Sequence, residues 1–309
     1  METLLRMQGI TKRYGREDVL TGADLELPTG SVTALLGRNG GGKSTLMRIA
    51  AGLLARDGGA AEVLGRDPDR LGPAELERMA YVTDGSGAWG GSRVQDELAL
   101  HRRLRAPRWS EERAQELLAR FELPARKRLR ELSKGQGARL RLVLALAADP
   151  VLLLLDEPAL GLDLFARRDL MDAVIELVDR EGRGVLVCSH LIDDVERLAD
   201  RVCFLRHGVM LAAGSVDELR DRYRRARLAL GAGGASALEG AAAAVVGVRR
   251  VAVEGELPAS ERVVVFEDFD PGALDDLAAR AGAEVLETRR MTLREVYFEL
   301  LAGGEEVRS

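Results

Sequence analysis

A glycine-rich segment, Gly37–Thr45, constrains the fold of this chain more than any other feature. It fits the pattern G-x-x-x-x-G-K-[ST], in which glycines let backbone N–H groups turn inward around phosphate oxygens. An apolar run, Val32–Leu36, leads into it as a predicted strand, and a helical run, Ser44–Leu54, leads out of it. The amino end of such a helix adds partial positive charge. The segment therefore predicts a strand, a phosphate-binding loop and a helix within an α/β fold.

The use of lysine supports phosphate binding over a glycine-rich turn that matches the pattern by chance. The chain has 45 basic residues, and only Lys12, Lys43, Lys127 and Lys134 are lysines. Lys43 stands where the loop chemistry needs an ammonium, which would reach the β- and γ-phosphates, and the Ser44 hydroxyl would hold Mg²⁺. We therefore predict that this loop binds a nucleotide. The predicted contacts are Asn39, Gly40, Gly41, Gly42, Lys43, Ser44 and Thr45.

Bulk composition limits the class of protein. A length of 309 residues allows a large domain plus a small one, and 46% hydrophobic residues can form a sizeable core. The net charge of −5 gives no indication of nucleic-acid binding. No apolar run approaches the roughly 20 residues of a membrane-spanning helix, and the start of the chain does not look like a secretory signal. Cys188 and Cys203 lie in apolar runs, which predicts buried free thiols in a reduced, cytoplasmic compartment.

Strands and helices alternate along the middle of the chain. Val151–Leu155 is a continuous apolar run, as expected for a central parallel strand buried on both faces. The alternation predicts an α/β layer structure with a mainly parallel sheet. Composition changes near residue 220, where the basic run Arg220–Arg227 is interpreted as a solvated helix end or linker. We expect a first domain over 1–222, with a helical subdomain at about 85–148, and a small C-terminal α+β domain over 223–309.

Two carboxylates, Asp156 and Glu157, follow the apolar strand Val151–Leu155 directly. Asp156 at the strand tip could hold Mg²⁺ through water, and Glu157 could face the attacking water as a general base. A solvated acidic loop is the alternative. The presence of a phosphate-binding loop upstream favours the catalytic interpretation.

Further motifs follow in a fixed order, and with them the chain resembles the ATP-binding subunits of ABC transporters. The resemblance covers about residues 3–222. In chain order, the matching segments are Tyr14, which corresponds to an adenine-stacking aromatic residue, Gly37–Thr45 (Walker A), Leu132–Gln136 (signature motif), Val151–Glu157 (Walker B), Ala159–Asp163 (D-loop) and His190 (switch histidine).

The resemblance implies a nucleotide-sandwich dimer. Each ATP would lie between the Walker A loop of one subunit and the signature motif of the other, where Ser133, Gly135 and Gln136 complete the site. His190 would contact the γ-phosphate, and Tyr14 would stack on adenine. Considered alone, Tyr14 would more often be a packed strand residue and His190 a structural histidine.

The chain departs from the family pattern at three positions. Asp84 stands where the family usually has a glutamine, and it is expected to be a Mg²⁺ ligand along with Ser44 and Asp156. Lys134 replaces the usual third residue, glycine, of the signature motif. Ala159 replaces a small hydroxyl residue in the D-loop. These departures bear on how ATP is coupled to a partner rather than on hydrolysis itself.

The sequence therefore predicts an ATP-hydrolysing subunit that powers export through a separate polytopic membrane permease. It would act as a homodimer or heterodimer at the cytoplasmic face of the membrane, with no nucleic-acid partner. Two alternatives remain: an ABC-type ATPase that acts on nucleic acid or ribosomes, and a regulatory nucleotide-binding subunit. The first would normally need two cassettes, a long coiled-coil insert or a basic surface.

Overall fold

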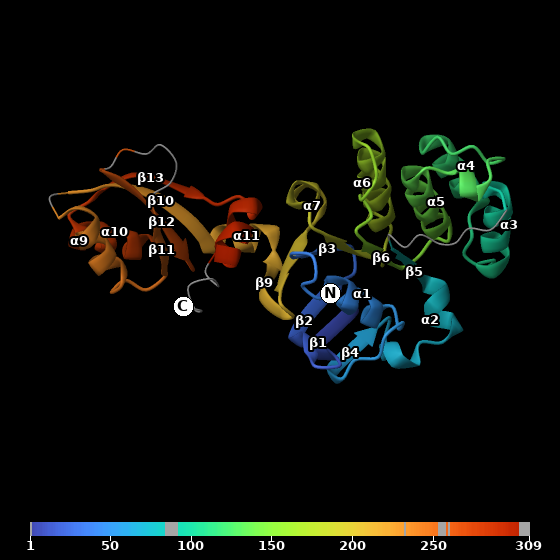
Figure 1. The fold of residues 1–309 in the computed structure, drawn as a ribbon, viewed down its shortest axis with the longest axis horizontal. Helices are drawn as coiled ribbons and strands as arrows, with labels where there is room; N and C mark the ends of the chain where they lie inside the picture. The colour runs from blue at the N-terminus through green and yellow to red at the C-terminus, as the bar shows by residue number, and fades with distance from the viewer. Residues whose placement is uncertain (1, 84–91, 232, 253–257, 259, 303–309) are drawn as a thin grey trace. The chain divides into compact units, whose positions relative to one another are not determined.

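The computed structural model describes residues 2–83, 92–231, 233–252, 258 and 260–302. The chain divides into two compact units, Met1–Ala213 and Gly214–Ser309 (Figure 1). Within the described residues, no helix has the length and apolar character needed to cross a bilayer. Asp84 lies outside the described residues, so its expected role as a Mg²⁺ ligand stays a prediction.

The first unit is built around a six-stranded sheet in the order β5-β6-β7-β3-β8-β9. The strand pairs from β5 through β8 are all parallel, which confirms the predicted mainly parallel sheet. Burial on both faces explains the near-continuous apolar sequences of its central strands. The strands are β3 (Ser31–Leu36), β5 (Met79–Val82), β6 (Leu152–Asp156), β7 (Gly184–Ser189), β8 (Arg201–Arg206) and β9 (Val209–Ser215).

A smaller antiparallel sheet shares an apolar core with the six-stranded sheet. It has the order β2-β1-β4, with β1 at Thr3–Tyr14, β2 at Glu17–Pro28 and β4 at Gly58–Val63. Side chains from this sheet, from α1 (Lys43–Ala50) and from the parallel sheet form one buried apolar cluster. The cluster fixes the strand and helix that flank the glycine-rich loop, so the loop is held between rigid elements.

The predicted helical subdomain contains α3 (Val94–Leu104), α4 (Glu111–Arg120) and α5 (Lys134–Ala147). Ser110 caps α4 by accepting a hydrogen bond from the Arg113 N–H, as its position before two acidic residues predicts. The other helices of this unit are η1 (Pro68–Arg70), α2 (Pro73–Arg78), η2 (Leu129–Glu131), α6 (Leu164–Val178) and α7 (Ile192–Leu198).

The second unit is a four-stranded antiparallel sheet in the order β11-β12-β10-β13. The element order β10-α9-β11-β12-α10-β13 gives it the split β-α-β topology. Apolar side chains of the sheet, including Ala226, Leu228 and Phe266, pack against α9 and α10. The elements are α8 (Val216–Arg222), β10 (Tyr223–Ala229), α9 (Gly234–Ala242), β11 (Val248–Ala252), β12 (Glu261–Glu267), α10 (Pro271–Ala281), β13 (Glu284–Arg290) and α11 (Leu293–Ala302).

The expectation that Arg220–Arg227 is a solvated helix end or linker was wrong for most of the run. Its second half belongs to β10, a central strand on which Tyr223 and Ala226 are fully buried. Arg225 and Arg227 alternate with the buried Ala226 and Leu228, so their long side chains lie on the opposite face of the sheet. The division between the units also falls at Ala213 rather than near Arg222, because α8 contacts α11 and β10 of the second unit.

An ion pair between Arg289 of β13 and Glu295 of α11 should make the stability of the second unit depend on pH. Arg289 Nη1 and Nη2 lie 2.9 and 2.5 Å from the carboxylate oxygens of Glu295, and these hydrogen bonds are the main cause that lowers the pKa of Glu295 from 4.5 to about 2. Because the folded-state pKa lies below the unfolded-state value, the pair stabilises the fold above the unfolded-state pKa. That stabilisation is lost as the pH falls through the folded-state pKa.

We therefore expect wild-type protein to lose more unfolding free energy between about pH 5 and about pH 2 than the Glu295→Gln variant. Urea unfolding of the full chain at several pH values, followed by pulsed hydrogen exchange in peptides from β10 and β13, measures this difference. Glu284→Gln removes an exposed carboxylate from β13 and should keep the wild-type dependence. The same pH dependence in Glu295→Gln and wild type would contradict this account of the pair.

Candidate functional site

Three neighbouring parallel strands bring the predicted site residues to one edge of the sheet. β3 lies next to β7, and β7 lies next to β6, all in the same direction. The glycine-rich loop follows β3, Asp156 and Glu157 stand at the end of β6, and His190 follows β7. The carboxyl ends of parallel strands are where open α/β sheets bind ligands. The fold therefore gathers residues that are far apart in the sequence.

The glycines of the loop are required by its backbone. Gly40 and Gly42 have φ angles of 78° and 100°, in the region that favours glycine. A Cβ atom on Gly42 would lie 2.8 Å from Leu20 Cδ2 and 2.9 Å from the Val19 carbonyl oxygen. The loop thus packs closely on β2 and starts α1 directly after Gly42. This packing leaves no room for a side chain at Gly42, directly before the helix.

Lys43 is buried at the start of α1, with 5% of its surface exposed. Its ammonium donates hydrogen bonds to the carbonyl oxygens of Gly37 at 2.8 Å and Arg38 at 3.3 Å. Glu157 Oε1 lies 3.7 Å from the same nitrogen. The cation is therefore aimed into the loop and held next to the carboxylate that follows β6.

Ser44 and Asp156 form a second contact between the loop and β6. The Ser44 hydroxyl donates to Asp156 Oδ1 at 3.1 Å, and the Tyr81 hydroxyl donates to Asp156 Oδ2 at 3.3 Å. Burial, followed by the charge of Asp156, raises the pKa of Tyr81 well above its usual value, so the phenol stays a donor. The hydroxyl and carboxylate oxygens fit the preference of Mg²⁺ for oxygen ligands. Sequence reasoning missed Tyr81, because no motif marks it.

Glu157 and His190 form a hydrogen-bonded pair, with Glu157 Oε2 2.7 Å from His190 Nδ1. Glu157 has a φ of 52°, a conformation that a non-glycine residue rarely adopts and that often occurs at functional sites. Its N–H donates to the Cys188 carbonyl oxygen at 3.0 Å, which fixes the turn after β6. Its Oε1 is buried and has no hydrogen-bond partner among the described residues.

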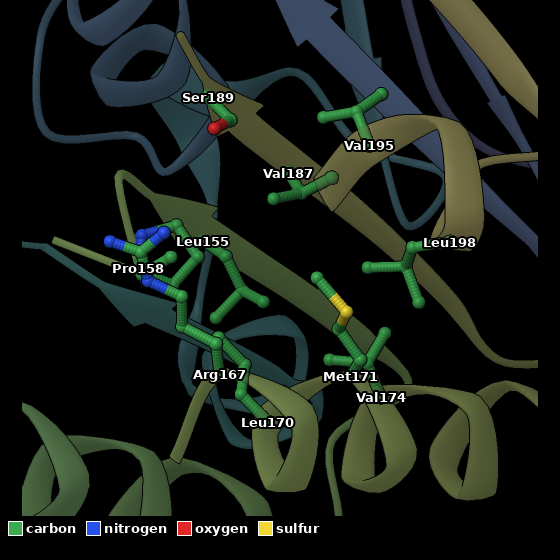
Figure 2. Close-up of a pocket in the computed structure, with 11 residues that line it drawn as sticks. Leu155, Pro158, Arg167, Leu170, Met171, Val174, Val187, Ser189, Val195 and Leu198 are labelled. Atoms are coloured by element: carbon green, nitrogen blue, oxygen red, sulfur yellow. The ribbon is translucent and has the colours of Figure 1, made fainter. Parts of the chain in front are cut away.

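Two cavities lie near this pair. A small one of about 10 Å³ is lined by Glu157, Thr83 and Arg141 among others, a volume at the lower limit for one water molecule. A second, of about 20 Å³, lies between β6, β7, α6 and α7 (Figure 2). Apart from Arg167 and Ser189, its side chains are apolar. It is therefore unsuited to a phosphate, and the polar chemistry lies at the strand ends instead.

The other predicted nucleotide contacts lie elsewhere in the first unit. Tyr14 ends β1 with 45% of its surface exposed, so its ring is not packed in the core. Ser133 caps α5, accepting a hydrogen bond from the Gln136 N–H at 3.1 Å. A Cβ atom on Gly135 would lie 2.8 Å from the Gly161 carbonyl oxygen. The signature motif and the D-loop are therefore packed against each other.

The buried cysteines were predicted correctly. Cys188 and Cys203 are free thiols in β7 and β8. Burial is the main cause that raises the pKa of Cys188 well above its usual value, and it raises that of Cys203 to about 12. Both thiols therefore stay protonated at neutral pH and act as small apolar residues in the sheet.

Comparisons with known proteins identify relatives of this chain. Residues 20–160 match the family model described as ABC transporter. The daunorubicin resistance ATP-binding protein DrrA3 of Streptomyces coeruleorubidus is 33% identical over 99% of this chain and 98% of its own length. The aliphatic sulfonates import ATP-binding protein SsuB of Corynebacterium glutamicum is 36% identical over 70% of this chain and 86% of its own length. A solved ATP-binding subunit of an ABC transporter covers 70% of this chain and 92% of its own, with 26% identity and a TM-score of 0.65.

The names of the sulfonates import protein and of the solved subunit refer to transport, which favours a transporter over the alternative that acts on nucleic acid or ribosomes. The chain belongs to the ATP-binding subunits of ABC transporters, and it is an ATPase of that family.

Proposed function

We propose that this chain energises export through a separate polytopic membrane permease, from the cytoplasmic face of the membrane. The observation that carries the proposal is the extent of the matches. The daunorubicin resistance protein matches 99% of this chain, including the second unit. The import protein of Corynebacterium glutamicum matches only 70% of it. A relationship over both units supports a role of the exporter type.

The proposed chemistry uses the contacts between the strand ends. Lys43 and the backbone N–H groups of the loop would hold the β- and γ-phosphates, together with Asn39, Gly40, Gly41 and Thr45. Ser44 and Asp156 would hold Mg²⁺, which would neutralise charge on the phosphates. Glu157 would accept the proton of the attacking water. Its hydrogen bond to His190 and its distance of 3.7 Å from Lys43 Nζ support this role, because both partners orient the carboxylate.

The proposed active unit is a dimer that encloses ATP. Tyr14 presents an exposed ring beside Lys12, whose ammonium lies 5.8 Å from the ring centroid. It would stack on adenine. Ser133, Gly135 and Gln136 would complete the site of the second subunit from the first turn of α5, where helix N–H groups favour an anion. The second subunit can be identical or different.

The proposed contact with the permease is the helical region near α2 and α3. Leu76, Leu100 and Leu104 are exposed there by 43%, 47% and 64%. Arg105 Nη1 donates to the Leu76 carbonyl oxygen at 2.6 Å, so the end of α3 lies beside α2. Exposed leucines on neighbouring helices suit an apolar protein partner. A membrane protein is the partner that an ATP-binding transporter subunit needs.

We expect Leu104→Glu to reduce binding of the full chain to washed native membranes. A charge placed in an apolar contact must be desolvated, which costs several kcal/mol if it stays unpaired, so about a hundredfold loss is expected. Leu53→Glu, at an exposed leucine after α1, is the control and should bind as wild type does. Sedimentation with membranes and the ATPase rate without membranes are the two measurements. Unchanged sedimentation of Leu104→Glu would contradict this docking surface.

A further inference from the structure

The carboxylate of Asp156 is held from two sides. It ends β6 with 7% of its surface exposed. The Ser44 hydroxyl reaches Oδ1 from α1 at 3.1 Å, and the Tyr81 hydroxyl reaches Oδ2 from β5 at 3.3 Å. Turning the carboxylate out of its plane would break both hydrogen bonds. Its two oxygens are therefore fixed, one toward the phosphate-binding loop and one toward β5.

Tyr81 is a donor with a fixed position. Its side chain packs against the apolar core that the two sheets of the first unit share. In the register of β5 with β6, Tyr81 lies beside Leu154, two residues before Asp156. The strand pairing and the core packing therefore hold the phenol at the end of β6. Removing the hydroxyl alone would leave both the pairing and the packing in place.

The proton of the phenol is directed at Asp156. Burial, and then the charge of Asp156, raise the pKa of Tyr81 well above its usual value, and the Arg48 cation of α1 opposes them less strongly. The phenol is therefore protonated at neutral pH. A guanidinium has donors and no acceptor, so the neighbouring Arg48 cannot accept this proton. The hydrogen bond consequently runs from the phenol to Oδ2 of the carboxylate.

A carboxylate held in this way does not suit all divalent cations equally. Mg²⁺ requires a near-octahedral geometry and retains several waters, so it takes few carboxylate oxygens. Ca²⁺ takes roughly six to eight oxygens in a flexible geometry, and often both oxygens of one carboxylate. A cation that binds both oxygens of Asp156 must compete with the phenol for Oδ2. The fixed Oδ1 beside Ser44 therefore suits Mg²⁺, and the hydrogen bond to Oδ2 disfavours Ca²⁺.

We propose that Tyr81 is a positioning residue that sets the preference of the nucleotide site for Mg²⁺ over Ca²⁺. It acts through Asp156 and touches neither the nucleotide nor the cation. This role rests on the proposed function, in which Ser44 and Asp156 hold the cation, and it does not depend on the direction of transport. Removing a side chain that hydrogen-bonds to a metal-binding carboxylate typically lowers metal affinity about 10- to 100-fold.

The test measures binding rather than hydrolysis. The full chain is titrated with a fluorescent, non-hydrolysable ATP analogue at a series of Mg²⁺ or Ca²⁺ concentrations, and in EDTA. In Tyr81→Phe the apparent Mg²⁺ affinity should fall about 10- to 100-fold, because Asp156 is free to turn. The Ca²⁺ affinity should change by less than about threefold, because Ca²⁺ gains access to the released oxygen. Nucleotide affinity in EDTA should equal that of wild type, because the phosphate-binding loop is unchanged.

Tyr223→Phe is the matched control. The Tyr223 hydroxyl donates to Glu267 Oε1 at 2.8 Å, so this variant also loses a hydrogen bond from a phenol to a carboxylate, but in the second unit. It should keep the wild-type ratio of Mg²⁺ affinity to Ca²⁺ affinity. A general loss of stability therefore cannot imitate the effect expected at Tyr81.

Ser44→Ala separates this inference from the proposed function. It removes a proposed ligand, so it should weaken the binding of both cations. If it does so while Tyr81→Phe keeps the wild-type ratio of the two affinities, the role of Tyr81 is overturned and the proposed cation site stands. If wild type binds the analogue equally well in Mg²⁺ and in EDTA, the proposed cation site fails, and the role of Tyr81 fails with it.

Discussion

The Glu157→Gln variant is expected to bind ATP and to hydrolyse it about 10²- to 10⁴-fold more slowly than wild type, the usual contribution of a general base. Glutamine keeps the shape of the side chain and the hydrogen bond toward His190, but it cannot accept the proton of the attacking water. The 3.7 Å contact with Lys43 loses one charge, while the bonds of Lys43 to the Gly37 and Arg38 carbonyls remain. The phosphate-binding loop should therefore keep its shape. Steady-state phosphate release and equilibrium ATP binding measure the two effects separately.

The control is Glu122→Gln. Glu122 has the same φ of 52° as Glu157 and is exposed after α4, so the substitution makes the same chemical change in the same backbone conformation. It should leave both measurements at the wild-type level. Because the unhydrolysed ATP should hold the dimer closed, Glu157→Gln should also elute as a dimer in size-exclusion chromatography with Mg²⁺ and ATP. Hydrolysis by Glu157→Gln near the wild-type rate would show that Glu157 is not the base.

The Lys43→Met variant should be impaired in ATP binding, the step that precedes hydrolysis. Methionine is similar in length and remains apolar along its stem, but it has no ammonium to donate to a phosphate. Loss of a hydrogen bond to a charged group costs about 1.5–3 kcal/mol, so ATP should bind roughly 10- to 100-fold more weakly. Lys43 is 5% exposed and donates hydrogen bonds to two carbonyl oxygens of the loop. Since methionine cannot make these bonds, the loop should also become less rigid. Fluorescent-nucleotide titration measures the affinity.

A matched control is Arg6→Met, which removes an exposed cation paired with Glu26 on the small antiparallel sheet. It should leave ATP affinity unchanged. The two variants at the ATP site are distinguished by their pattern: Glu157→Gln separates binding from hydrolysis, whereas Lys43→Met lowers both. If the Lys43→Met protein is folded by circular dichroism and binds ATP as wild type does, Lys43 does not contribute to ATP binding.

The fold of the first unit could be predicted from the sequence because its signals are local. The apolar runs of β3, β6 and β7 are bounded by glycines or by acidic residues, and the loop at Gly37–Thr45 allows few backbone arrangements. Since these strands are parallel, the motifs that follow them had to meet at one edge of the sheet. The contact between Ser44 and Asp156 is the result.

The second unit was less predictable for a physical reason. In β10, the buried Ala226 and Leu228 alternate with Arg225 and Arg227, whose long side chains lie on the opposite face of the sheet. Such side chains hide an apolar pattern, because their stems pack while their charged ends remain in contact with acids. The sequence therefore indicated a solvated helix end or linker, whereas residues from Tyr223 onward form a central strand. The contact of Tyr81 with Asp156 was not predicted, because it depends on the pairing of β5 with β6, which no local sequence pattern reveals.

The central claim is that this chain supplies ATP hydrolysis to a membrane permease, and affinity purification from native membranes tests it most directly. The tagged full chain should be recovered from detergent-solubilised membranes together with a protein that has several membrane-spanning segments. The purified complex should hydrolyse ATP, and the same complex prepared with Glu157→Gln should not. Recovery with ribosomes or nucleic acid, and with no membrane protein, would contradict the claim.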